Sequence, residues 1–217
     1  MDTDLLKLLV PFFYKSAPLY VKKGQVIIRP EDTLNNIYFI EKGFVRFYHL
    51  SEDGKEYTFL IYKPGYVFPI IYTFTGKATR YYFEAMTPVT LRRTTREEFG
   101  KILEENSPLS NLINKELVIR FEELLEKEEL LSFGNASRIV AYILRSCALQ
   151  FGEPVQKYIV IQLKLRHQDI ASMAGLTRET VSIEMKKFEN EGLIQYRRGR
   201  IQIREQKVFN KATGLDF

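Results

Sequence analysis

The side chains with the most specific chemistry lie in one segment near the C-terminal end, Arg178 to Asn190. If this segment is a helix, Val181, Met185 and Phe188 form its buried side. Its outer, N-terminal part then carries an arginine, a glutamate, a serine, an isoleucine and a lysine. Arginine can chelate guanine O6 and N7, glutamate can accept from cytosine N4, serine can bond to either strand, and isoleucine can pack on a thymine methyl group. This chemistry suits base edges in the major groove of DNA. The alternative is that these residues form an ordinary solvated helix face. The residues concerned are Arg178, Glu179, Ser182, Ile183 and Lys186.

The residues before this segment predict a second, shorter helix and a tight turn. His167 to Ala174 has a helical pattern, and Gly175 permits the turn that follows. The hydroxyl of Thr177 can cap the next helix, and Gly192 can end it. Ala171 is small enough to let the two helices cross closely. The segment is therefore interpreted as a helix-turn-helix.

A β-hairpin is predicted directly after the second helix. Two apolar segments, Leu193–Tyr196 and Ile201–Ile203, flank a tip that contains three arginines. Such a hairpin beside a helix-turn-helix is a wing, and its arginines suit DNA phosphates. A further short strand is expected over Ile159 to Leu165. The arginines of the predicted tip are Arg197, Arg198 and Arg200.

The net charge supports a polyanionic partner for this region. The 217-residue chain carries a formal charge of +5, and residues 155–217 hold twelve Lys or Arg against seven Asp or Glu. The whole excess lies there, which fits nucleic acid or an anionic membrane. No apolar stretch approaches the roughly 18 residues of a membrane helix, and the acidic start Met1–Asp4 lacks the basic region of a signal peptide. We therefore expect a cytoplasmic protein without a membrane partner.

The cysteine and histidine content argues against a metal site and against an enzyme. Cys147 is the single cysteine, and His49 and His167 are the two histidines. One chain cannot build a four-cysteine zinc site or a cysteine-ligated iron–sulfur cluster from these. The sequence contains no nucleophile motif and no phosphate loop, so we expect no catalytic residues. Cys147 recurs with apolar residues at helical spacing, which favours a buried structural thiol over a redox sensor.

The first half of the chain has the pattern of an all-β domain. From about Gly24 to Thr95, short β-branched or aromatic runs alternate with turn residues, which predicts a compact antiparallel sandwich or roll. The predicted strands include Val26–Ile28, Ile37–Ile40, Phe44–Leu50 and Tyr57–Tyr62.

A long helix is predicted from Pro108 to Leu131, because this segment contains no Gly and no further Pro. Its apolar residues follow a four-three spacing that is typical of a helix seam. The seam could pack on the chain's own β domain or pair with the same helix of a second chain. Asn135 or Ser137 can cap the helix that follows. The seam residues are Leu117, Phe121, Leu124 and Leu131, with Glu128 in one slot.

The whole chain resembles the CRP/FNR family of bacterial transcription regulators. The resemblance lies in Gly24, Gly43, Gly54 and Gly65 and above all in Leu165–Gly175 followed by Thr177-Arg178-Glu179-Thr180-Val181. It implies an α+β fold: a cyclic-nucleotide-type antiparallel β-roll (residues 1–107), a dimerisation helix (108–134) and a winged helix-turn-helix (135–217). Family members bind double-stranded DNA as homodimers, so it also implies a two-fold symmetric operator and, for an activator, RNA polymerase as a partner. Under this resemblance Arg178, Glu179 and Ser182 read bases, whereas His167, Gln168, Thr177 and Thr180 lie near phosphates.

Two points limit the transfer of detailed family properties. Many relatives have an arginine where this chain has Ile183, so their operator half-sites do not carry over. A winged-helix module that binds proteins instead of DNA is the alternative function.

The sequence is compatible with more than one effector for the predicted β-roll. Cyclic-nucleotide binders carry a Gly-Glu pair and an Arg-Ser pair, but here the corresponding segments read Phe68-Pro69-Ile70-Ile71 and Thr79-Arg80-Tyr81. The resemblance therefore argues against cAMP. Tyr82 to Val89 is similar to the nitrogen-control branch, which binds 2-oxoglutarate through arginines, and Arg80 and Arg120 could play those parts. An unidentified apolar or aromatic effector, or no effector at all, are the alternatives.

Overall fold

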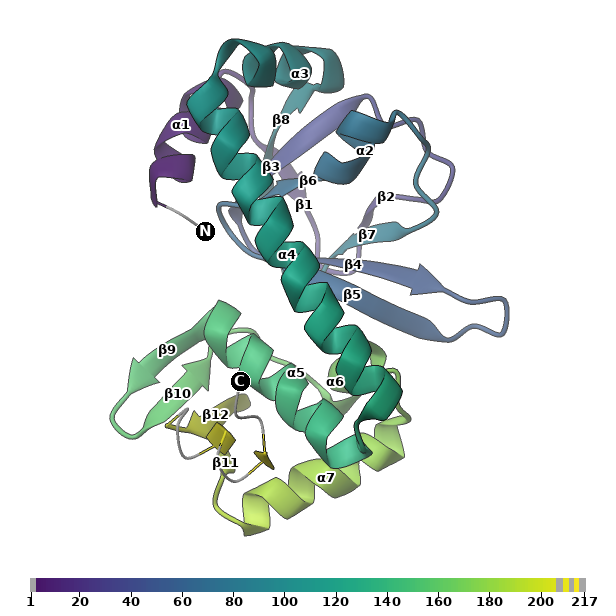
Figure 1. Cartoon of the computed structure of the whole chain (residues 1–217), viewed down its shortest axis with the longest axis vertical. Coiled ribbons are helices and arrows are strands. Elements are labelled where there is room, and N and C mark those ends of the chain that lie inside the picture. The colour runs from purple at the N-terminus through teal and green to yellow at the C-terminus, as the bar shows by residue number, and fades with distance from the viewer. Residues whose placement is uncertain (1–2, 206–208, 211–212, 215–217) are drawn as a thin grey trace. The chain divides into compact units, whose positions relative to one another are not determined.

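The computed structural model describes residues 3–205, 209–210 and 213–214. The chain forms two compact units, Met1–Glu122 and Glu123–Phe217. One long helix, α4 (Ser107–Phe133), belongs partly to each unit (Figure 1).

The first unit contains two four-stranded sheets whose paired strands are all antiparallel. One has the order β1-β8-β3-β6 and the other the order β2-β7-β4-β5. The predicted antiparallel roll is therefore confirmed. The strands are β1 (Leu19–Val21), β2 (Val26–Ile28), β3 (Asn36–Lys42), β4 (Val45–Leu50), β5 (Glu56–Tyr62), β6 (Val67–Phe68), β7 (Tyr82–Ala85) and β8 (Val89–Thr95).

The expectation of an all-β first domain is wrong, because the unit also contains three helices before α4. They are α1 (Thr3–Phe13), α2 (Ile70–Thr75) and α3 (Arg96–Glu105). A capping box starts α3: the Glu98 backbone N–H donates to the Thr95 hydroxyl (3.1 Å), and the Thr95 N–H donates to the Glu98 carboxylate (3.1 Å).

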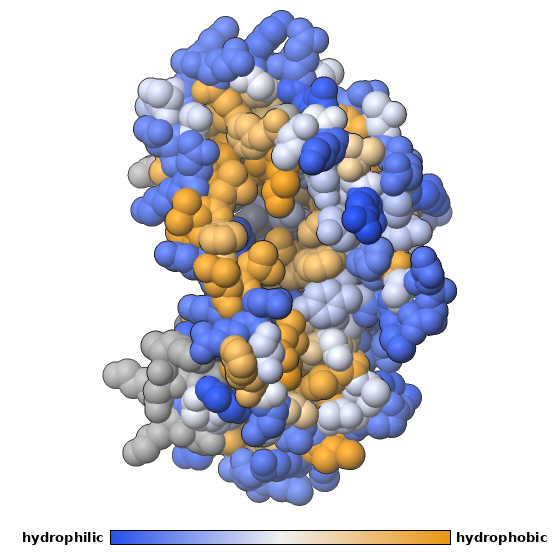
Figure 2. All heavy atoms as spheres, turned by 45° about the vertical axis from the view of Figure 1, so that its right-hand side comes forward, coloured by the Kyte–Doolittle hydropathy of each residue, from blue (hydrophilic) through white to orange (hydrophobic). Residues whose placement is uncertain are grey.

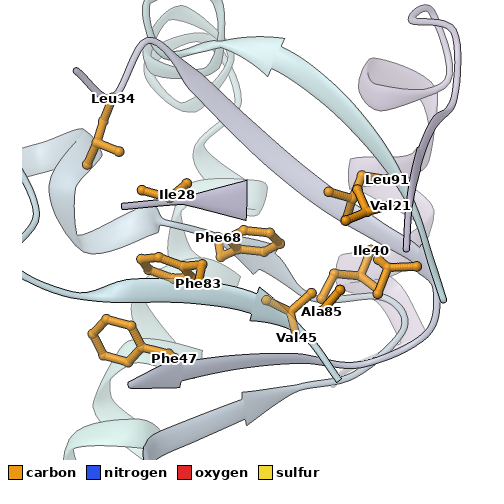
Figure 3. Close-up of a cluster of buried hydrophobic side chains, with 11 residues drawn as sticks. Val21, Ile28, Leu34, Ile40, Val45, Phe47, Phe68, Phe83, Ala85 and Leu91 are labelled. Atoms are coloured by element: carbon orange, nitrogen blue, oxygen red, sulfur yellow. The ribbon is translucent and has the colours of Figure 1, made fainter. Parts of the chain in front are cut away.

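Apolar side chains fill the space inside the roll (Figure 3). Phe68 and Phe83 stack with ring centroids 5.3 Å apart, and Tyr62 packs on both rings. A second cluster joins Phe13 of α1, Phe39 of β3 and Phe99 of α3. Strand β3 is thus covered on both faces, since Ile40 packs inside the roll while Phe39 packs beneath the helices.

A tight turn after β3 depends on Gly43. Its φ is +88°, and an added methyl group would meet the carbonyl oxygen of Pro88 and lie 2.9 Å from the Cα of Val89. Gly54 also has a positive φ, +79°, but nothing lies within 4 Å of a methyl group there. A side chain at Gly54 would therefore meet backbone strain alone, whereas a side chain at Gly43 would meet both backbone strain and steric crowding.

Gly43→Ala should therefore destabilise the first unit more than Gly54→Ala. Positive φ costs a non-glycine residue about 1–2 kcal/mol at either site, and crowding should add about 1–3 kcal/mol at Gly43. Urea denaturation of the two variants measures the difference in unfolding free energy. An equal loss of unfolding free energy in the two variants would show that the backbone around Pro88 moves to accommodate the added methyl group at no energetic cost.

The predicted long helix is confirmed, and its apolar residues have two different surroundings. Leu109 and Ile113 are buried in the second cluster of the first unit, and Leu117 packs against that cluster. Between Val118 and Leu125, large apolar side chains are exposed: Val118 is 58% exposed, Phe121 60% and Leu125 53%. Figure 2 shows one face of the molecule coloured by hydropathy, and apolar side chains gather on that face. The exposed stripe is turned from the predicted seam toward Val118 and Leu125, which the seam did not include.

The second unit is built around α5 (Ala136–Phe151). Asn135 caps this helix, as one of the two predicted caps, because its side chain accepts from the Arg138 N–H (3.0 Å). The predicted burial of Cys147 is confirmed at 3% exposure. Burial raises the pKa of its thiol to about 12, which disfavours the thiolate that a redox sensor needs. Nearby Lys127 is also buried, and burial lowers its pKa to about 8.

Up to residue 205, the second unit also contains two helices after α5 and a four-stranded antiparallel sheet with the order β11-β12-β10-β9. The strand expected over Ile159 to Leu165 is shorter than predicted and ends at Ile161, and Gln162–Leu165 leads to the next helix without strand pairing. The elements are β9 (Gly152–Val155), β10 (Tyr158–Ile161), α6 (His167–Ala174), α7 (Arg178–Asn190), β11 (Ile194–Arg197) and β12 (Arg200–Arg204).

Candidate DNA-binding interface

The two helices α6 and α7 have the predicted bounds and form a helix-turn-helix. The carboxylate of Asp169 accepts from the Arg166 N–H (2.7 Å) at the start of α6. Gly175 ends this helix with a left-handed φ of 65°, and its N–H donates to the Ala171 carbonyl. The Thr177 hydroxyl then accepts from the Thr180 N–H (3.1 Å) and caps α7. The caps and the glycine thus fix where each helix begins and ends.

Helix α7 has one buried and one exposed side. Val181, Met185 and Phe188 are at most 2% exposed. Arg178, Glu179 and Lys186 are exposed on the other side, together with Ile183 at 68%. A single exposed apolar side chain is ordinary on a protein surface, so Ile183 is informative only together with the charged residues beside it. An open hollow of about 520 Å³ also borders this side, lined by Ser182, Ile183, Lys186, Lys187, Asn190 and Glu191.

The predicted hairpin is present as β11 and β12. Arg197 and Arg200 are paired, and Arg198 and Gly199 form the tip with φ values of 53° and 71°. Two successive residues with positive φ are typical of the tight turns that connect twisted antiparallel strands. Arg197 and Arg198 are exposed, and Arg200 is half-buried. The hairpin therefore presents two exposed guanidinium groups at one end of the sheet.

His167 connects α6, α7 and β11 by hydrogen bonds. Its Nδ1 lies 2.8 Å from the Ser182 Oγ, and its Nε2 lies 2.8 Å from the Tyr196 hydroxyl. The Ser182 hydroxyl in turn donates to the Arg178 carbonyl at 2.8 Å. Burial and the nearby Glu189 carboxylate raise the pKa of Tyr196 to about 12, so its hydroxyl keeps its proton at neutral pH.

Two other predicted contact residues have partners within the chain. The Lys186 ammonium group lies 3.0 Å from the Glu189 carboxylate, and the two side chains are 68% and 38% exposed. Surface pairs of this kind contribute little and can exchange for another anion. The Thr180 hydroxyl lies 2.9 Å from the Thr177 hydroxyl, so it supports the cap of α7.

The two arginines proposed for an effector come from different elements of the first unit. Arg80 is exposed between α2 and β7. Arg120 on α4 donates to the Tyr66 hydroxyl, and its guanidinium carbon lies 4.9 Å from the Tyr66 ring centroid. Burial raises the pKa of Tyr62 and of Tyr72, while Arg120 opposes this rise at Tyr62 and Arg80 opposes it at Tyr72. Each arginine thus lies near one of these two tyrosines.

Comparison with known proteins agrees with this architecture. A family model described as cyclic nucleotide-binding domain matches residues 18–106, and one described as Crp-like helix-turn-helix domain matches residues 137–209. The chain is also 31% identical over 193 residues to the global nitrogen regulator of Nostoc sp., which covers 88% of this chain and 86% of the relative. The chain belongs to the CRP/FNR family of DNA-binding transcription regulators.

Other members of the CRP/FNR family are similar over nearly the full length. The nitrogen fixation regulation protein FixK of Bradyrhizobium diazoefficiens is 28% identical, over 88% of this chain and 80% of the relative. The structure of a CooA mutant from Carboxydothermus hydrogenoformans matches with a TM-score of 0.81 and 26% identity, and covers 98% of this chain and 97% of that one. The winged helix-turn-helix of this regulator is therefore a DNA-binding module of a known type.

The structure brings together most of the residues that the sequence singled out for DNA in this CRP/FNR regulator. Arg178, Glu179, Ile183 and Lys186 share one exposed side of α7, with the half-buried Ser182 among them, and the wing arginines lie on one hairpin. Sequence reasoning did not single out Tyr196, which contacts His167 across 29 residues of sequence. No spacing rule links residues so far apart, so this contact had no signal in the sequence.

The described part of this regulator provides neither a candidate membrane helix nor a candidate metal cluster. Within residues 3–205, 209–210 and 213–214, no helix is long and apolar enough to cross a membrane. The same residues contain no cluster of three or more His, Cys, Asp or Glu side chains that could hold a metal ion.

Proposed function

We propose that the exposed side of α7 reads base edges in the major groove of a two-fold symmetric operator. The observation that carries this proposal is the composition of that side: Arg178, Glu179 and the exposed Ile183 lie on a helix whose opposite side is fully buried. Arginine, glutamate and isoleucine suit guanine, cytosine and the thymine methyl group, respectively. Ser182 and Lys186 complete the proposed reading surface.

The wing and the N-terminal ends of the two helices hold the DNA backbone in this proposal. The exposed Arg197 and Arg198 and the half-buried Arg200 lie on one hairpin. Phosphate contacts from such arginines fix the register of the protein but carry no sequence information. Gln168 and Thr177, at the starts of α6 and α7, can approach phosphates with the helix N-termini.

The regulator acts as a homodimer in this proposal, and α4 is the dimerisation element. Val118, Phe121 and Leu125 are each more than half exposed on this helix. Burying such side chains in a symmetric contact releases roughly 25 cal/mol per Å² of apolar surface. The predicted seam residues Phe121 and Leu124 belong to the same exposed stripe.

Selection of binding sites from random-sequence DNA with the full-length protein tests this function. We expect one enriched site with two inverted half-sites whose centres lie about one helical turn apart. Enrichment of a single unsymmetrical half-site would contradict the dimer, and recovery of random DNA would favour a protein-binding role for the winged helix.

A small dicarboxylate such as 2-oxoglutarate is the second part of the proposal, as an effector of the first unit. It is supported by two cationic side chains, Arg80 beside Tyr72 and Arg120 beside Tyr62 and Tyr66, and by the 31% identity to a global nitrogen regulator. The matched cyclic nucleotide-binding domain lacks the Glu and Ser that hold ribose and phosphate in cAMP binders. We therefore propose that the regulator binds no cAMP.

Calorimetry with the pure protein should detect binding of 2-oxoglutarate and no binding of cAMP. Arg80→Ala and Arg120→Ala should each weaken 2-oxoglutarate binding at least about tenfold, because each variant leaves one carboxylate without a charged partner. Arg29→Ala removes an exposed arginine elsewhere in the first unit and serves as the control. Micromolar binding of cAMP would overturn the proposal.

A further inference from the structure

A chain of three hydrogen bonds runs from the wing to the first turns of α7. It links the Tyr196 hydroxyl to His167 Nε2 (2.8 Å), His167 Nδ1 to Ser182 Oγ (2.8 Å), and Ser182 Oγ to the Arg178 carbonyl oxygen (2.8 Å). His167 and Ser182 are half-buried, so water competes only partly for these bonds.

The last bond of the chain fixes the direction of the others. A hydroxyl group has one proton, and a carbonyl oxygen can only accept, so the proton of Ser182 goes to Arg178. The Ser182 oxygen must then accept from His167, which places a proton on Nδ1. In the neutral ring, Nε2 is therefore an acceptor, and the Tyr196 hydroxyl donates to it.

We propose that His167 is a positioning residue: by donating to the Ser182 oxygen it holds the serine proton on the Arg178 carbonyl, so that Ser182 is a hydrogen-bond acceptor only, and it thereby selects the base that Ser182 contacts. This inference rests on the proposed function, in which Ser182 lies on the reading surface. A serine with a freely rotating hydroxyl can donate or accept, and so it tolerates several bases. With its proton committed, Ser182 offers one remaining lone pair, which suits the amino groups of adenine N6 and cytosine N4.

Part of the sequence preference then depends on residues that lie outside the reading helix. His167 belongs to α6 and Tyr196 to β11, and neither needs to contact a base. A role in stability alone would predict weaker binding to all DNA without a change in preference. The two roles are therefore separated by the preferred base at one position and by the tautomer of His167.

The tautomer is measured by nitrogen-15 NMR of the free protein, in which His49 and His167 give the two histidine signals. We expect the wild-type His167 to carry its proton on Nδ1. Ser182→Ala should shift the proton to Nε2, because only Tyr196 then remains as a partner. Tyr158→Phe removes a hydroxyl from the same sheet and should leave the tautomer unchanged. An Nε2–H tautomer in the wild type would overturn the inference.

Site selection from random DNA then tests the effect on base preference. Ser182→Ala identifies the base pair that Ser182 reads. His167→Asn keeps a donor near the position of Nδ1, and we expect it to retain the preference for an amino-bearing base. His167→Gln places its amide near the position of Nε2 instead, and the preference at that base pair should fall about tenfold.

Tyr196→Phe tests the same hydrogen-bond chain without changing His167. Because it deletes a single oxygen atom, it keeps the test valid even if the histidine variants fold poorly. It should reduce the same preference about fivefold, as expected for the loss of one hydrogen bond. Unchanged preference in His167→Gln would overturn the inference while leaving the proposed function intact. A wild-type protein that selects no symmetric site would instead overturn the proposed function, and the tautomer measurement on the free protein separates these two failures.

Discussion

The double substitution Phe121→Glu and Leu125→Glu is expected to convert the regulator from a dimer to a monomer and to reduce operator affinity by about 10²–10⁴-fold. Both side chains are more than half exposed on α4, so the change leaves the core of each unit intact. Four carboxylates facing one another across a dimer contact would be desolvated without partners. A monomer then binds one half-site and loses the gain from linking two half-site interactions.

Sedimentation velocity and fluorescence anisotropy with a selected operator measure the two effects. Lys101→Glu places the same charge on an exposed position of α3 and should leave both assembly and affinity near the wild-type values. A wild-type protein that sediments as a monomer at micromolar concentration, with and without DNA, would refute the expected interface. So would a double variant that remains dimeric.

Substitutions in α7 and in the wing should weaken DNA binding in two different ways. Glu179→Ala removes a proposed base contact, and it should cost about 1–3 kcal/mol on the selected site and relax the preference at one base pair. Arg198→Ala removes a proposed phosphate contact. It should weaken binding to selected and random DNA alike. The slope of the logarithm of the binding constant against the logarithm of salt concentration should fall in magnitude by about one unit per subunit, because each wing then neutralises one phosphate fewer.

Binding to matched and singly substituted sites across a salt series separates these effects. Glu191→Ala removes an exposed carboxylate from the far end of α7 and is the control for a simple change in net charge. Equal losses on all sequences for Glu179→Ala would show that this side chain is not a base reader. An unchanged salt slope for Arg198→Ala would show that the tip of the wing does not reach the phosphates.

The helix-turn-helix was predictable to the residue because its boundaries are set by local chemistry. Thr177 can cap only a helix that starts beside it, and Gly175 and Gly192 adopt left-handed φ values that other residues avoid. The capping box of Thr95 and Glu98 carried an equally local signal for α3. That helix was missed because the surrounding strand pattern dominated the interpretation of the first domain.

Features that depend on tertiary packing were not predictable in the same way. The spacing of apolar residues indicates that α4 has an apolar side, but whether Leu117 or Val118 is covered depends on the helices α1 and α3 packed nearby. The bond between His167 and Tyr196 needs the wing strand and α6 to be adjacent. Local propensities carry no information about such long-range neighbours.

The buried thiol of Cys147 gives the regulator a practical property. With its pKa raised to about 12 and its side chain 3% exposed, it should react very slowly with maleimide or disulfide reagents. Since Cys147 is the single cysteine of the chain, a new cysteine at a surface position would be labelled selectively without prior mutagenesis. Glu104→Cys, at an exposed position of α3 outside the proposed dimer contact, would place one fluorophore or spin label on each chain. In a dimer, the distance between the two labels would report directly on assembly in solution.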